Sequence, residues 1–146
     1  MTSPRAIGIN HVALEVGDLG AAVQFYRDVF GFPLRGEAPG AAFLDMGDQF
    51  LALSEHSGGP PDGGRHFGLV VDDRDAVREA LAETAAEILP GRGLDFRDPW
   101  GNRVQVVEYA DVQFTKAPHV LEGMGAAGLG KTEGAREELA RKGMVP

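Results

Sequence analysis

An internal repeat is the feature that most constrains how this chain of 146 residues can fold. The apolar run His11–Val16 has a counterpart in His66–Val71, and both begin on a histidine and lead into an acidic turn. Two later turns, Asp45–Asp48 and Asp98–Asn102, also correspond, and each precedes an apolar stretch. Self-similarity along a chain indicates repeated supersecondary units. The chain is therefore expected to fold as two matched modules.

Each half contains one amphipathic helix after its first apolar run. Asp18 can cap the first helix through its carboxylate, apolar residues then recur at helical spacing as far as Phe30, and Gly31 can end it in the left-handed conformation. The second half repeats this pattern, with Glu and Arg opposite an apolar face made of Val77, Ala80, Leu81 and Ala85. A helix is thus predicted in each module.

The other apolar segments predict four strands in each module, and a Gly- and Pro-rich linker at 55–64 separates the modules. The expected strands are Ile7–Val16, Phe32–Gly36, Ala42–Met46 and Phe50–Ser54, then His66–Val71, Ile88–Leu89, Leu94–Arg97 and Arg103–Tyr109. The order is βαβββ, in modules at about 7–54 and 65–109, so the class is α+β. Two such modules side by side can form a curved mixed sheet, with helices outside and a cup inside.

A tail at 110–146 follows the two modules, which together make a domain at 1–109. It contains many glycines, a short helix that Thr132 can cap, and several large apolar residues. Leaving those residues in water is unfavourable, because burying each one stabilises by roughly 1.5–3 kcal/mol. The tail is expected to dock on the sheet or on a neighbouring subunit, with Leu139 and Met144 as late anchors.

Charge and composition exclude several kinds of partner. The net charge of −8 and the absence of a basic cluster argue against nucleic-acid binding. The chain has no cysteine, which excludes disulfides, thiolate catalysis and cysteine-bound metals. The segment Met1–Asn10 lacks the apolar run of a signal peptide or membrane span. No membrane partner and a cytoplasmic location are therefore expected.

Two segments carry a resemblance to a known family. They are His11–Leu19, with Phe25-Tyr26 and Phe30–Phe32 behind it, and Asp98–Arg103. From Ile7 to Tyr109 the chain resembles the vicinal-oxygen-chelate (VOC) superfamily, which contains glyoxalase I, extradiol dioxygenases and bleomycin-resistance proteins. The resemblance implies the cup-shaped fold, but a fold of this kind hosts many chemistries.

The resemblance also implies a divalent metal at the bottom of the cup, held by the first and last strands of each module. His11 and His66 match the two first-strand ligands. The family usually places a glutamate four residues after the turn glycine, which is Gly101 here, but this chain has Gln105. The matching position of the first module is Ala52. The predicted metal ligands are therefore His11, His66 and Gln105.

This set of ligands predicts weak binding of a divalent metal such as Fe, Mn, Zn or Ni. Two imidazoles and a glutamine carbonyl are all neutral and leave the charge of the ion uncompensated. Glu108 could supply a carboxylate instead, but side chains alternate along a strand, so a β-bulge would be needed to place it beside Gln105. Glu15 shares a face with His11 and could serve the pocket or simply the surface.

The resemblance leaves two classes of function open. One is a metal-dependent lyase, isomerase or dioxygenase acting on a small oxygenated molecule, with the metal as Lewis acid. The other is a metal-free protein that binds a small molecule such as an antibiotic, as bleomycin-resistance proteins do. A fosfomycin-type transferase is disfavoured, because its cluster of cationic and hydroxyl residues is not found at matching positions. No catalytic residue and no organic cofactor are assigned. A homodimer is expected, since exposed sheet edges favour pairing.

Overall fold

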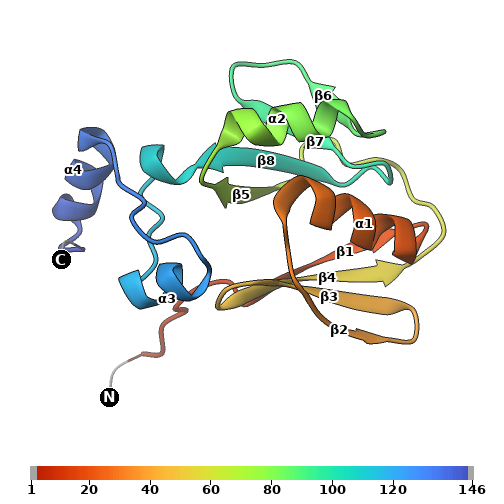
Figure 1. Ribbon diagram of the computed structural model, residues 1–146, viewed down its shortest axis with the longest axis horizontal. Coiled ribbons are helices and arrows are strands. Elements are labelled where there is room, and N and C mark those ends of the chain that lie inside the picture. Colours follow the sequence, from red (N-terminus) through yellow and green to blue (C-terminus); the bar gives the residue numbers. More distant parts are fainter. Residues whose placement is uncertain (1–2, 145–146) are drawn as a thin grey trace.

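The computed structural model describes residues 3–144 and contains two βαβββ modules (Figure 1). The first consists of β1 (His11–Val16), α1 (Leu19–Phe30), β2 (Leu34–Ala38), β3 (Ala41–Met46) and β4 (Gln49–Glu55). The second consists of β5 (Phe67–Val71), α2 (Arg74–Ala82), β6 (Glu87–Leu89), β7 (Leu94–Arg97) and β8 (Arg103–Glu108). The predicted α+β class and module order are confirmed. The first two residues of the segment Met1–Asn10 and the last two of the tail lie outside the described residues.

Small differences from the predicted elements occur at their ends. Residues 7–10 are exposed, non-strand chain in front of β1, and Ile7 is 93% exposed. The apolar side chains of this segment therefore do not extend the first strand. Tyr109 does not end β8 but begins a 3-10 turn, Tyr109–Asp111. Asp18 and Asp73 cap α1 and α2 by accepting hydrogen bonds from backbone N–H groups three residues on.

Within one chain, the described strands form two sheets of four rather than one continuous sheet. The strand orders are β1-β4-β3-β2 and β5-β8-β7-β6, so each module has the same topology. In both sheets the first strand pairs in parallel with the last, and the other pairs are antiparallel. The sheets are held together through side chains and not through strand pairing.

One hydrophobic core joins the two modules. Helices α1 and α2 contact each other, and α1 lies between the two sheets (Figure 1). Every second residue of β1 and β8 points into this core, as do the apolar faces of both helices. Its members include Leu14, Val16, Tyr26, Leu51, Leu53, Leu81, Phe96, Val104 and Val106. Burial of this continuous apolar surface is the main force that fixes the modules relative to each other.

A buried hydrogen bond also links the modules at the edge of this core. The Tyr26 hydroxyl group donates to Asp98 Oδ2 at 2.7 Å, and both residues are buried. Burial and the neighbouring Asp98 carboxylate raise the pKa of Tyr26 well above its usual range. Tyr26 is therefore a neutral donor in the folded protein.

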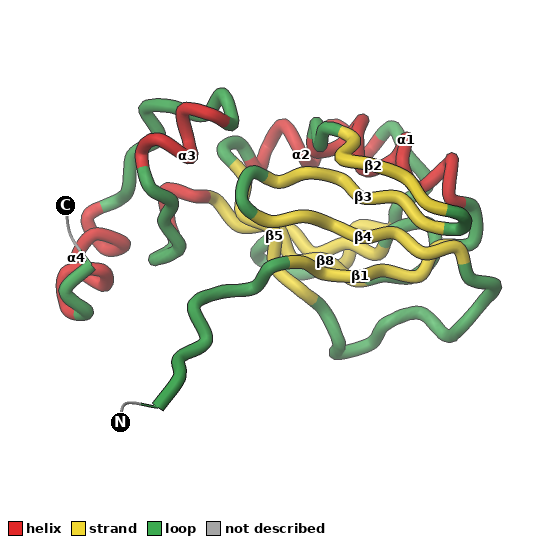
Figure 2. Tube along the Cα trace, turned by 90° about the horizontal axis from the view of Figure 1, so that it is seen from below, coloured by secondary structure: helices red, strands yellow, loops and turns green. Residues whose placement is uncertain are grey.

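The other face of each sheet points away from the shared core. Residues of β1 alternate between the two faces, so Leu14 and Val16 are buried while His11, Ala13 and Glu15 are exposed. Figure 2 looks onto this exposed face of the first sheet, which no helix of the described chain crosses. The helices thus lie on the opposite side of the sheet from the face that carries His11.

The tail forms two short helices, α3 (Pro118–Gly123) and α4 (Glu133–Arg141). Leu121 and Leu139 are buried, but neither belongs to the core cluster of the modules, and α4 contacts the 3-10 turn Tyr109–Asp111. Docking on the sheet or on a neighbouring subunit stays a prediction. The Met144 anchor was wrong: this residue follows the end of α4 and is 59% exposed. None of the helices at 3–144 is both long and apolar enough to cross a membrane.

A lysine holds the tail to the second module. Lys131 Nζ donates to the carbonyl oxygen of Val112 at 2.8 Å and to those of Tyr109 and Phe114, and it lies over the Tyr109 ring at 3.4 Å from the ring centre. Desolvation lowers the pKa of this ammonium group. The ammonium group satisfies carbonyl groups where β8 ends and the tail begins.

Replacing Tyr26 by phenylalanine should destabilise the fold. Tyr26→Phe keeps the ring in the core but removes one donor from the buried Asp98 carboxylate, so the free energy of unfolding should fall by about 1–3 kcal/mol. Urea unfolding followed by circular dichroism measures this. A loss much below that range would mean that the bond between the modules adds little to stability.

The pH dependence provides a control for the same bond. The raised pKa means that the folded state holds the Tyr26 proton more tightly than the unfolded state does. Its contribution is fully present below the ordinary tyrosine pKa of about 10 and is lost as the pH rises above it. The stability difference between wild type and Tyr26→Phe should therefore shrink above that pH.

Candidate metal site

The second sheet carries two of the predicted ligands on its exposed face. Gln105 lies in the middle of β8, opposite Gly68 of β5 and Asp95 of β7, and its side chain is exposed. His66 directly precedes β5 and is also exposed. Its Nδ1 lies 2.8 Å from the Gly64 carbonyl oxygen. A carbonyl oxygen only accepts, so Nδ1 carries the proton and the Nε2 lone pair stays available.

His11 begins β1 and lies on the exposed face of the first sheet. Its Nδ1 is 2.9 Å from Asn10 Oδ1, an acceptor, so Nε2 is again the nitrogen with the available lone pair. The imidazole stacks on Phe50 of β4, with ring centres 4.7 Å apart and planes within 10°. The stacking and the Asn10 bond together fix the orientation of this histidine.

The strand register makes Ala52 the counterpart of Gln105. In the first module Ala52 pairs with Ala13, two residues after His11, and in the second Gln105 pairs with Gly68, two residues after His66. The two modules therefore place corresponding residues at corresponding points of their exposed faces. The Ala52 corner of the site offers no donor atom.

Glu108 does not take the place of Gln105. β8 keeps one regular register with β5 and β7 and has no bulge, so Glu108 lies on the opposite face from Gln105. Its Oε1 accepts a hydrogen bond of 2.6 Å from the backbone N–H of Arg74, in the first turn of α2. Glu55 does the same for Leu19 in the first turn of α1, at 3.0 Å. Both glutamates stabilise a helix N-terminus.

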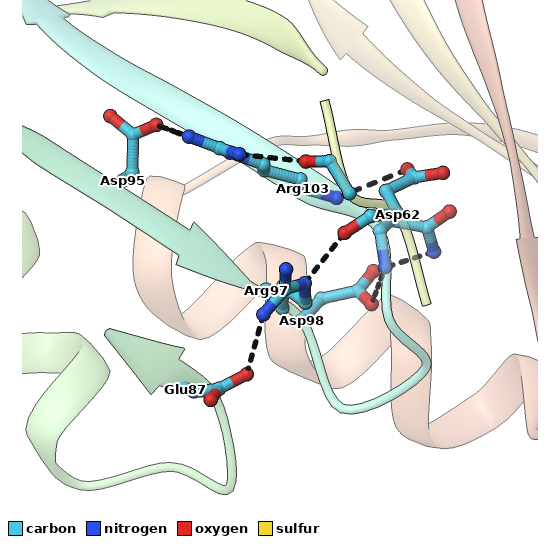
Figure 3. Close-up of polar contacts among 8 residues, drawn as sticks. Asp62, Glu87, Asp95, Arg97, Asp98 and Arg103 are labelled. Atoms are coloured by element: carbon cyan, nitrogen blue, oxygen red, sulfur yellow. Dashed lines mark hydrogen bonds and ion pairs between the residues drawn. The ribbon is translucent and has the colours of Figure 1, made fainter. Parts of the chain in front are cut away.

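A network of ion pairs covers part of the second sheet's exposed face (Figure 3). Arg103 contacts Asp95 at 2.8 Å and Arg97 contacts Glu87 at 3.1 Å. Both arginines also donate to backbone carbonyl groups of the linker, at Asp62 and Gly63. The linker is thereby tied across the end of the sheet, close to His66. This network was not predicted from the sequence, although Arg103 has the same strand parity as Gln105.

Other histidines and aromatic residues lie near the sheets or in the core. His56, in the linker, and His119, in α3, are both exposed. Glu15 is exposed on the His11 face, and Phe96 is fully buried in the core. A groove of about 1170 Å³ runs between β1, the linker and the turn at 98–102, and it includes Glu15, His56, His66 and Trp100 in its lining.

The three predicted ligands come from two separate sheets. His11 lies on the exposed face of the first sheet, whereas His66 and Gln105 belong to the exposed face of the second, and both faces point away from the shared core. Within residues 3–144, no cluster of three or more His, Asp or Glu side chains is arranged to hold a metal ion. Convergence of the three residues on one metal stays a prediction.

Comparison with known proteins identifies the family. The model of the Glyoxalase/Bleomycin resistance protein/Dioxygenase superfamily matches residues 8–106, which is well over half of the chain. The chain therefore belongs to this superfamily, and the resemblance seen in the sequence is confirmed.

Similar proteins include enzymes with different activities. Metallothiol transferase FosB of Staphylococcus haemolyticus is 31% identical over 97 residues, which cover 62% of this chain and 70% of FosB. Lactoylglutathione lyase from Agrobacterium tumefaciens is 31% identical, with a TM-score of 0.54, over 72% of this chain and 96% of that one. A mutant of the fosfomycin resistance protein FosX from Listeria monocytogenes, complexed with Mn(II) and 1S,2S-dihydroxypropylphosphonic acid, shares the fold at 17% identity and a TM-score of 0.63, over 70% and 90% of the two chains.

The position of Glu108 yields a prediction about stability. Glu108→Ala removes the acceptor for the first turn of α2 and should lower the free energy of unfolding by about 0.5–2 kcal/mol. Mn(II) affinity should not change. Glu79→Ala, on the exposed side of the same helix, is the control and should have little effect on either quantity. A loss of metal affinity in Glu108→Ala alone would make Glu108 a ligand and contradict the assignment.

Proposed function

We propose that this protein is a metal-dependent enzyme of the VOC superfamily that acts on a small oxygenated molecule at a site built from two chains. In this proposal His11 comes from one chain, and His66 and Gln105 come from its partner. The active form is then a homodimer with two equivalent sites, the commonest symmetry for a soluble oligomer.

The orientation of the two histidines carries the proposal. Histidines that bind metals almost always donate their other ring N–H to a carbonyl, carboxylate or similar acceptor, which fixes the tautomer. His66 has this arrangement through Gly64, and His11 has it through Asn10. Two exposed histidines at equivalent repeat positions, each with Nε2 left available, fit ligands better than they fit ordinary surface residues.

The shared core supports a site assembled from two chains. Each chain buries the helix-covered faces of its sheets against each other, which leaves the His11 face and the Gln105 face directed outward. A second copy placed against these faces could close a cup that one chain leaves open. The edge strands β1 and β5, which lie beside the two histidines, would gain cover in the same contact.

The donor set fits a divalent ion held weakly. Imidazole nitrogen suits Mn, Fe, Zn and Ni, and the Gln105 carbonyl oxygen adds a neutral third donor. When bound, such an ion polarises two neighbouring oxygens of a substrate as a Lewis acid. The protein's own contribution is to orient the imidazoles through Asn10, Phe50 and Gly64 and to line the cup with the half-buried Phe43 and Phe50.

The proposed site is compatible with several classes of reaction. Lyase, isomerase and dioxygenase chemistry all use such a site, and the similarity to metallothiol transferases adds group transfer to these. The alternative is a metal-free small-molecule binder, which the missing carboxylates at Gln105 and Ala52 favour. Metal binding separates the two functions.

Restoring the family's glutamate should strengthen metal binding. Gln105→Glu adds a charged oxygen at the same reach, so Mn(II) affinity should rise by about tenfold or more, the range of one charge-assisted contact. Calorimetric titration of chelator-treated protein measures this. Gln113→Glu in the tail adds the same charge elsewhere and should leave the affinity unchanged. A folded Gln105→Glu variant with unchanged affinity would remove Gln105 from the site.

Mixing two inactive variants tests whether the site spans two chains. His11→Ala and His66→Ala should each abolish Mn(II) binding alone. After unfolding and refolding together in equal amounts, random pairing should restore about one quarter of the wild-type sites, because half of the dimers contain one intact site. Electron paramagnetic resonance of bound Mn(II) counts the sites. A mixture that binds no more than the separate variants would contradict the two-chain site.

A further inference from the structure

An arginine with no acidic partner among residues 3–144 lies on the same exposed face as His11. β2 and β3 pair at Leu34–Leu44 and at Gly36–Phe43, so Arg35 is one extra residue between these pairs, a β-bulge. Bulges commonly redirect a side chain beside a functional site. Here the guanidinium carbon of Arg35 lies 4.4 Å from the centre of the Phe50 ring, on the face that Phe50 shares with His11.

Phe50 holds both the imidazole and the guanidinium group. His11 stacks nearly parallel to this ring at 4.7 Å, so both groups pack on one aromatic side chain. A guanidinium group over an aromatic ring is held by cation–π attraction and keeps its N–H donors at the ring edge free for an acceptor. The charge of Arg35 is therefore positioned, although its side chain is exposed.

Arg35 forms no ion pair within the described part of one chain, although the carboxylate of Asp45 lies on the same face, directly opposite Phe50. Arg97 and Arg103 on the second sheet are each paired with a carboxylate, but Arg35 takes part in none of the ion pairs formed by residues 3–144. The proposed metal ligands His11, His66 and Gln105 supply no negative charge. A divalent ion beside this arginine would bring three positive charges to this face, more than the carboxylates of Asp45 and Glu15 there can balance.

From this we infer that Arg35 binds an acidic group of the substrate, so that the substrate is an anion with two neighbouring oxygens and a separate acidic group such as a carboxylate. The inference rests on the proposed metal site for the position of the neighbouring oxygens. The anion would supply the negative charge that the protein ligands lack, and its acidic group could accept two parallel hydrogen bonds from the guanidinium group.

Lactate and malate are suitable probes for this inference. Both carry a hydroxyl group next to a carboxylate, and malate adds a second carboxylate. Calorimetric titration of the Mn(II)-loaded protein should show malate binding about tenfold more tightly than lactate, the range expected for one charge-assisted contact. In Arg35→Gln this ratio should fall to near one, while lactate affinity changes little.

Arg27→Gln is the matched control. Arg27 is an exposed arginine in the last turn of α1, on the core side of the first sheet, so its loss changes the net charge equally. The ratio of malate to lactate affinity should stay at its wild-type value. Mn(II) binding, measured separately by electron paramagnetic resonance, should be intact in both variants.

The outcomes separate this inference from the proposed function. If wild-type protein binds no Mn(II), the proposed function fails, and the same titrations on chelator-treated protein still decide the role of Arg35. A loss of the malate preference confined to Arg35→Gln supports the inference with or without metal. An equal ratio in wild type and Arg35→Gln, or no preference for malate in the wild-type protein, overturns it.

Discussion

The buried carboxylate of Asp98 is the polar interaction that fixes how the two modules are oriented across their shared apolar core. Asp98 is only 3% exposed, and a carboxylate in that position is costly unless it is fully hydrogen-bonded. Its two oxygens accept from the Tyr26 hydroxyl, from the backbone N–H groups of Trp100 and Asn102, and from the Asn102 side chain. Because Tyr26 belongs to the other module, satisfying this charge also locks the modules together.

The packing of the two modules determines which faces of the sheets are available for a functional site. Asn102 also donates to the backbone carbonyl oxygen of Glu15, so the same turn holds β1 beside the second module. Because the core faces of the two sheets pack against each other, only their other faces are exposed. These exposed faces carry His11 on one sheet and Gln105 on the other. The turn at 98–102, which helped to identify the family, thus has a structural role rather than a catalytic one in this chain.

Local features of the fold could be predicted from the sequence, and long-range ones could not. The repeat and the helix caps were sufficient for the βαβββ order, because they depend on neighbouring residues. Strand alternation also indicated that Glu108 faces away from Gln105, which the regular register of β8 bears out. The separation of the strands into two sheets depends on how the modules pack, and no local pattern encodes it.

In the candidate site, too, the sequence predicted local features but not long-range ones. His11, His66 and Gln105 were selected through the family resemblance, and the exposure of His11 and Gln105 follows from strand alternation. Arg35 was missed because its orientation comes from a bulge, which requires the register of two paired strands to detect. The capping role of Glu55 and Glu108 was also missed, since each contact spans more than thirty residues of sequence.

The exposed face of the first sheet also carries apolar side chains. Phe43 and Phe50 are in contact there, and Ala13 and Ala52 pair beside them, so an apolar patch, bordered by Asp45 and Glu15, adjoins the imidazole of His11. Contiguous apolar surface of this kind marks an interaction site more often than an ordinary exterior. β1 and β5 are edge strands of their sheets, so one side of each has no neighbouring strand within the described chain. Since His11 begins β1 and His66 directly precedes β5, one contact between two copies would cover the apolar face, protect both edges and bring the histidines of different chains together.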